Sequence, residues 1–113
     1  MENVQHGDLG IVSVRVVKRE VTVRMIRYSL DANDGWWILA DDDLPIPEIE
    51  NVTTVCVHCV IKQLDPEVAS VMDLALADAR ANEVGVGVAV RAKTGRWFTG
   101  EKALDVLETE SRP

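Results

Sequence analysis

Cys56, His58 and Cys59 are the side chains best suited to metal binding or redox chemistry, and they lie in one short segment. A structural zinc site takes four ligands, usually from two such clusters on turns, and a redox-active cysteine pair lies at a helix N-terminus. The run 52–61 instead alternates like a β-strand. On a strand Cys56 and His58 share one face and Cys59 lies on the other, which is poor geometry for a disulfide. We therefore expect reduced thiols, no metal and no cofactor.

Three further patterns have the residue types of a site without its context. Gly85 and Gly87 match the start of a dinucleotide-binding loop, but they lie inside a strand pattern and not in a turn that leads into a helix. The segment 31–35 has the acids of a calcium loop with its glycine one position early, so it indicates a turn. The three aspartates at 41–43 are consecutive and point in alternating directions, unlike a catalytic pair. The sequence contains neither a Gly-x-Ser-x-Gly elbow nor His-Glu-x-x-His, and we predict no catalytic residue.

The acidic residues are concentrated in one part of the chain. The sequence has 113 residues, with 12 Lys and Arg against 19 Asp and Glu, and a net charge of -7. Residues 31–50 contain seven of these acids and no base, so this segment alone equals the net charge of the chain. An overall negative field opposes binding to nucleic acid and to anionic membrane surfaces, and we expect neither as a partner.

The same acidic segment carries aromatic and apolar side chains, a composition that suits protein binding. Aromatic anchors supply affinity and carboxylates steer a basic partner. We expect a non-catalytic protein-binding module of the inhibitor, immunity or accessory type, with a basic protein as its partner. The expected partner-binding residues are Asp34, Trp36, Trp37, Asp41, Asp42, Asp43, Leu44, Ile46, Glu48 and Glu50. The alternative is that Leu44, Ile46 and Ile49 cover a sheet edge and the acids only keep the loop hydrated.

Two other function classes stay open. A small-molecule-binding domain or enzyme would use a pocket between the sheet and a helix at 65–82, with Tyr28, Cys56 and His58 as its candidate side chains. A self-assembling structural subunit would instead use a sheet face as its interface.

The first half of the chain is expected to form strands. Valines alternate with polar residues over 9–30 on either side of a polar break at 18–20, which predicts a hairpin of two long strands. The apolar phase of the second strand shifts at Met25 and Ile26, as at a β-bulge. Further strands are expected at 36–40 and 52–61, with a proline-containing loop between them.

The second half of the chain adds two helices. Asp65 and Pro66 indicate a helix start, because the carboxylate can cap free amides and proline needs no donor there. Apolar residues then recur with helical spacing to about Asn82. Strands at 85–90 and 96–99, a turn at 93–95 and a short helix at 101–108 complete the chain.

These elements predict an α+β fold: a mainly antiparallel sheet of about six strands, in the order β-β-β-β-α-β-β-α, with the main helix and the short C-terminal helix packed on one face. We expect a single domain over 1–113 with frayed ends at 1–8 and 109–113. One side of the fifth strand carries Val84, Val86, Val88 and Val90. With both helices on the other face, these valines need a cover, for which we expect a homodimer.

The N-terminal residues 1–8 lack a basic stretch followed by an apolar run, so we expect no signal peptide and a cytoplasmic protein. Charges or glycines interrupt every apolar run well before the roughly 18 residues that a membrane span needs.

Overall fold

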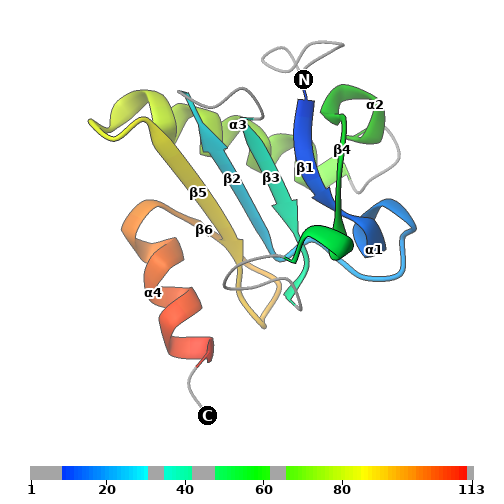
Figure 1. Ribbon diagram of the computed structural model, residues 1–113. Helices are drawn as coiled ribbons and strands as arrows, with labels where there is room; N and C mark the ends of the chain where they lie inside the picture. The colour runs from blue at the N-terminus through cyan, green and yellow to red at the C-terminus, as the bar shows by residue number, and fades with distance from the viewer. Residues whose placement is uncertain (1–8, 31–34, 42–47, 62–65, 112–113) are drawn as a thin grey trace.

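The computed structural model describes residues 9–30, 35–41, 48–61 and 66–111 (Figure 1). The strands are β1 Leu9–Ser13, β2 Met25–Ser29, β3 Trp36–Leu39, β4 Val52–Cys56, β5 Val86–Arg91 and β6 Trp97–Thr99. The helices are α1 Val14–Val17, α2 Val57–Ile61, α3 Pro66–Ala81 and α4 Gly100–Ser111, with a 3-10 turn, η2, at Ile49–Asn51. In this part of the chain no helix is long and apolar enough to cross a membrane.

The six strands form one sheet in the order β4-β1-β3-β2-β5-β6. Neighbouring strands are antiparallel except β1 and β3, which run parallel. The predicted α+β class with a mainly antiparallel six-stranded sheet is therefore confirmed.

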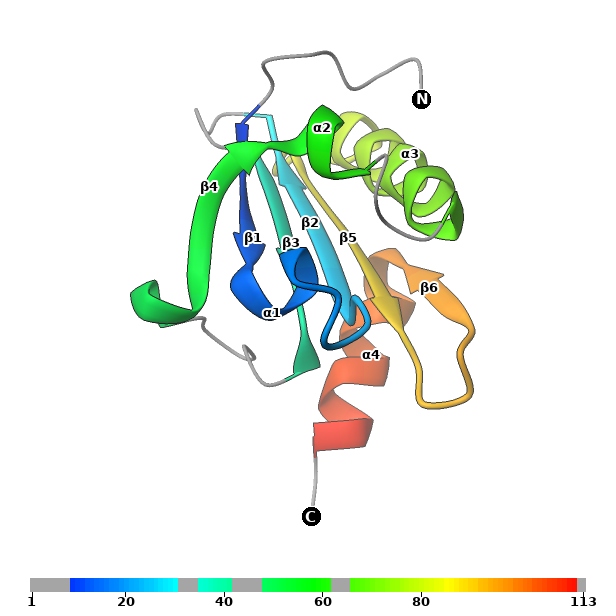
Figure 2. The same cartoon turned by 90° about the vertical axis from the view of Figure 1, so that its right-hand side faces the viewer.

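The two long helices lie on opposite faces of this sheet, as Figures 1 and 2 show. Ile26 and Ala89 are fully buried in the core under α3, whereas Met25 and Val90 are buried against Ala103 of α4. The expectation that both helices pack on one face was wrong. Neighbouring residues of β2 and β5 point to opposite faces, and both faces are apolar enough to need a cover.

The same two-sided burial accounts for the phase shift in β2. Met25 pairs with Leu39 and Val90, and Ile26 pairs with Ile38 and Ala89. This register is continuous through both residues, so the predicted bulge is absent from β2. The shift marks the point where consecutive apolar side chains enter two separate cores.

The predicted hairpin of 9–30 was also wrong. After β1 the chain forms the single helical turn α1, which buries Val16 at 1% exposure, and Arg19 then takes a positive φ of 61°. β1 pairs with β3 and β4, not with β2. Alternating valines indicate which side chains are buried, but they do not identify the strand that pairs alongside. The sequence pattern therefore predicted that β1 pairs with the next strand, β2, whereas β3 lies between them in the sheet.

The segment 52–61 divides into β4 and α2 where we expected one strand. Val57 at the start of α2 is fully buried in the core beneath α3. Val55 of β4 also packs against this core, so the helical turn keeps Val57 on the buried side of the chain.

The second half of the chain follows the prediction closely. Asn82 ends α3: its side-chain amide donates to the carbonyl oxygens of Asp78 and Val86 at 2.7 Å each, and its side-chain oxygen accepts from the Gly85 amide at 2.8 Å. Gly85 has a φ of 74°, which suits glycine. α4 extends to Ser111, beyond the predicted end at Glu108, while residues 1–8 and 112–113 lie outside the described residues.

The valine face of β5 is covered by the chain itself. Val90 is fully buried and Val88 packs against the same cluster, which includes Ala103 of α4. Val84 precedes the strand and is 74% exposed. Self-association stays a prediction, but it no longer follows from an uncovered valine face.

Candidate functional site

The described acids of the segment 31–50 lie on the surface at two places. Asp41 follows β3, with a side chain that is 79% exposed. Glu48 and Glu50 flank Ile49 at η2; both are exposed, and Ile49 itself is 90% exposed. The expected partner-binding residues Asp34, Asp42, Asp43, Leu44 and Ile46 lie outside the described residues.

The adjacent tryptophans face opposite sides of the sheet, as their sequence positions predict. Trp36 is 2% exposed in the core under α3, and its ring centroid lies 4.5 Å from that of Tyr28. It is therefore a core residue, and its place among the partner-binding residues is corrected. Trp37 lies on the other face, partly buried, with the Arg27 guanidinium 5.1 Å from its ring centroid.

The candidate ligand-pocket residues occupy three different elements. Tyr28 is on β2 and packs into the core under α3, Cys56 ends β4, and His58 is in α2. The chain becomes helical after Cys56, so the strand alternation that put Cys56 and His58 on one face does not apply. Cys56 and Cys59 form no disulfide, and no group of three or more metal-ligating side chains occurs among the described residues. The pocket hypothesis stays a prediction.

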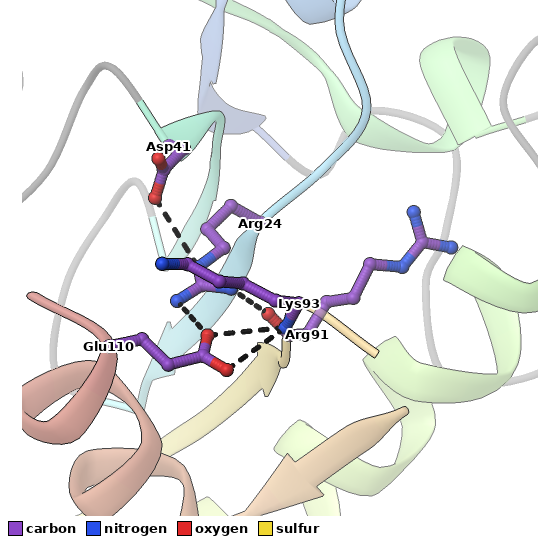
Figure 3. A network of polar contacts seen from close by, with 5 residues as sticks. All are labelled: Arg24, Asp41, Arg91, Lys93 and Glu110. Atoms are coloured by element: carbon purple, nitrogen blue, oxygen red, sulfur yellow. Dashed lines mark hydrogen bonds and ion pairs between the residues drawn. The ribbon is translucent and has the colours of Figure 1, made fainter. Parts of the chain in front are cut away.

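A polar network that the sequence analysis missed is centred on Arg24 (Figure 3). The backbone of Arg24 is held between two strands: its amide donates to the Leu39 carbonyl at 2.8 Å, and its carbonyl accepts from the Arg91 amide at 2.9 Å. Its side chain is only 11% exposed. The guanidinium donates to Glu110 Oε1 at 2.7 Å and to the Arg91 carbonyl, and its Nε lies 3.4 Å from Asp41 Oδ1.

Glu110 connects α4 to this end of the sheet. Besides binding Arg24, it accepts the backbone N–H of Lys93 on both carboxylate oxygens, at 3.1 and 3.2 Å. The Lys93 amide, followed by the Arg24 guanidinium, lowers the pKa of Glu110, because both stabilise the ionised form. The network therefore joins α4, Arg24 directly before β2, and the β5–β6 turn through charge-assisted hydrogen bonds.

A shallow hollow of about 370 Å³ adjoins the network. It is lined by Thr22, Val23, Arg24, Asp41, Arg91, Ala92, Lys93 and Gly95. This lining includes a hydroxyl but no histidine or cysteine, so it offers no nucleophile beside a histidine base. The contacts of Glu110 with Arg24 and Lys93 support a structural role for the network, because they hold α4 against the sheet.

One signal in the sequence was available for this network. Arg24 stands in an otherwise apolar run between Val23 and Met25, where a charged residue requires a partner. Nothing local points to Glu110 as that partner, because the two residues are separated by 86 positions.

Comparison of the chain with protein-family models, with curated proteins and with solved structures gives no match.

Proposed function

We propose that this protein is a non-catalytic protein-binding module, of the inhibitor, immunity or accessory type, that presents its acidic segment to a basic protein. The observation that carries the proposal is the exposure of Ile49, at 90%, between the exposed acids Glu48 and Glu50. The alternative, in which Ile49 covers a sheet edge, requires a buried side chain and is not supported.

This arrangement combines two sources of binding energy. A large apolar side chain held out in water gains about 1.5–3 kcal/mol when a partner buries it completely. The neighbouring carboxylates attract a basic surface from a distance and raise the rate of association. Asp41 adds a third exposed acid beside β3, and the segment 31–50 has a formal charge of -7.

The proposal is tested by affinity capture with the immobilised full chain. Proteins retained at roughly 50 mM salt should be basic and should elute as the ionic strength rises to roughly 500 mM, because screening shortens the Debye length severalfold. The double variant Glu48→Gln and Glu50→Gln should retain much less of them, as should the triple variant in which Asp41, Asp42 and Asp43 become asparagine.

A control of equal charge separates the acidic surface from the net charge. Glu83→Gln with Glu101→Gln also removes two exposed acids, but from the turn after α3 and the start of α4. This control variant should retain the same amount of the basic proteins as the wild type does. Equal loss in both double variants, or capture that does not respond to salt, would contradict the proposal.

A further inference from the structure

The two edge strands of the sheet differ in how well they are protected. β6 has three residues; Arg96 precedes it, and it ends at Thr99, before Gly100, where φ is 64°. β4 has five residues, Val-Thr-Thr-Val-Cys, of which four are β-branched and none is charged. Short strands, charges, prolines and bulges are the usual protection of a sheet edge; β6 is short, whereas β4 is longer and contains no charge, proline or bulge.

Among the residues that the structure describes, β4 is an edge strand of the sheet. β4 pairs with β1 on one side in a continuous antiparallel register from Leu9↔Cys56 to Ser13↔Val52. Along its other side no described strand is paired, and Figure 2 shows β4 at the margin of the molecule. In an antiparallel ladder only alternate residues direct their N–H and C=O toward the neighbour, so the remaining residues of β4 direct theirs outward.

We propose that an extended segment of the basic partner adds to the outer edge of β4 as a seventh strand of the sheet. This inference rests on the proposed function and gives its mode of binding, strand addition. The acidic turn leads directly into the edge: Glu48 and Glu50 flank Ile49, and β4 begins at Val52. A strand along β4 therefore ends beside two exposed carboxylates, which favour basic side chains at that end of the added segment.

Charge also favours a foreign partner over a second copy of the chain. Each copy carries a net charge of -7, so two copies repel each other, whereas a basic segment is attracted to the same surface. Backbone hydrogen bonds along the edge supply affinity, and the alternating pockets between side chains supply specificity.

The test uses peptides of defined sequence with the full chain. The probe is a short peptide of alternating Lys and Val, and its matched control is the same peptide N-methylated at every residue, which keeps the charge but removes the amide donors of both edges. We expect the probe to bind, to protect backbone amides of β4 from hydrogen exchange, and to bind at least about tenfold more tightly than the control.

Two proline variants test the same edge from the protein side. Thr53 and Thr54 are neighbours, so the amide of one is directed toward β1 and that of the other outward. Proline lacks the amide hydrogen. Of Thr53→Pro and Thr54→Pro, the variant with the smaller loss of melting temperature reports the outward position. That variant should weaken probe binding about tenfold, whereas alanine at the same position should not.

Each other result has a defined meaning. Equal binding of the N-methylated control, or no probe binding while salt-sensitive capture persists, overturns strand addition and leaves the proposed function standing. Equal binding of a peptide of alternating Glu and Val would contradict the claim that the added segment is basic. Slow hydrogen exchange of the outward amides of β4 in the free protein would show that the edge is already occupied, and would overturn the proposal. Sedimentation then gives the mass of the free protein, which distinguishes occupation by a second copy from occupation by other residues of the same chain. If charge neutralisation at Glu48 and Glu50 leaves capture unchanged, the proposed function itself fails.

Discussion

Gly87→Ala is expected to destabilise the fold strongly, because β5 packs directly on the backbone of α3 at this point. A Cβ at Gly87 would lie 1.8 Å from the carbonyl oxygen of Ala75 and 2.7 Å from the amide nitrogen of Ala79. An ordinary C···O contact is about 3.3 Å, so strand and helix have to separate by about 1.5 Å.

The magnitude follows from what this separation disturbs. α3 buries Val71, Met72 and Leu76 against the sheet, and these contacts loosen when the helix moves away. Overpacking a core typically costs about 1–3 kcal/mol. The atoms that collide here belong to the backbone and are not relieved by a rotamer change, so we expect a loss of about 3 kcal/mol. For a domain of this size the loss lowers the melting temperature by about 12 °C.

The assay is equilibrium unfolding in urea followed by circular dichroism, with Gly95→Ala as the control. Gly95 undergoes the same chemical change at a φ of 93°, but its new Cβ would have no atom within 4 Å. The control should lose about 1–2 kcal/mol from backbone strain alone. A smaller loss for Gly87→Ala than for Gly95→Ala would refute direct packing of α3 on β5.

Three further predictions concern the network, the core and the surface. Glu110 has a pKa below its ordinary value of 4.5 because of the backbone amide and guanidinium that bind it; it therefore stabilises the fold above that pH and loses this contribution in acid. The melting temperature of Glu110→Gln should lie below that of the wild type at neutral pH and converge with it as the pH falls, and a constant difference would contradict this role. Ser13 is fully buried, and its hydroxyl has no hydrogen-bond partner among the described residues, so Ser13→Ala should raise the free energy of unfolding by about 1 kcal/mol; a clear loss would reveal a partner. Ile49→Ala should change stability by less than about 0.5 kcal/mol, whereas Ile38→Ala, at a fully buried position, should cost about 2–5 kcal/mol; similar costs would mean that Ile49 is a core residue.

Elements with local signals were predicted well. Helix α3 begins at Pro66, where proline fixes φ, and it ends where Asn82 binds the last turn. The β5–β6 hairpin follows from period-two apolar residues around a glycine-containing turn. A helix was expected on the face of β5 opposite its valines, and Gly87 and Ala89 on that face do lie against α3.

Elements that depend on distant partners were predicted poorly. The valines of α1 alternate as a strand would, but one turn of helix buries Val16. Cys56 and His58 were assigned to one strand face, yet the chain turns into α2 between them. In both places the propensity is β-like, and burial against other elements overrides it.

The candidate site divides in the same way. The acidic segment is defined by the charges of residues 31–50 alone, so its location in the chain was evident without any coordinates. Whether a side chain of this segment is buried depends on which elements pack against it. Only the fold shows that Trp36 lies in the core and that Ile49 is exposed to water.

By itself, therefore, the sequence determined the acidic segment, the α+β class and those elements whose first and last residues are indicated by adjacent capping or turn residues. Tertiary structure decided the strand order, the parallel pairing of β1 with β3, the opposite faces of α3 and α4, and the contact of Arg24 with Glu110. The physical reason is that backbone propensities and caps act over a few residues, whereas burial and ion pairing act between segments far apart in the chain, and the pattern of one segment does not identify the other.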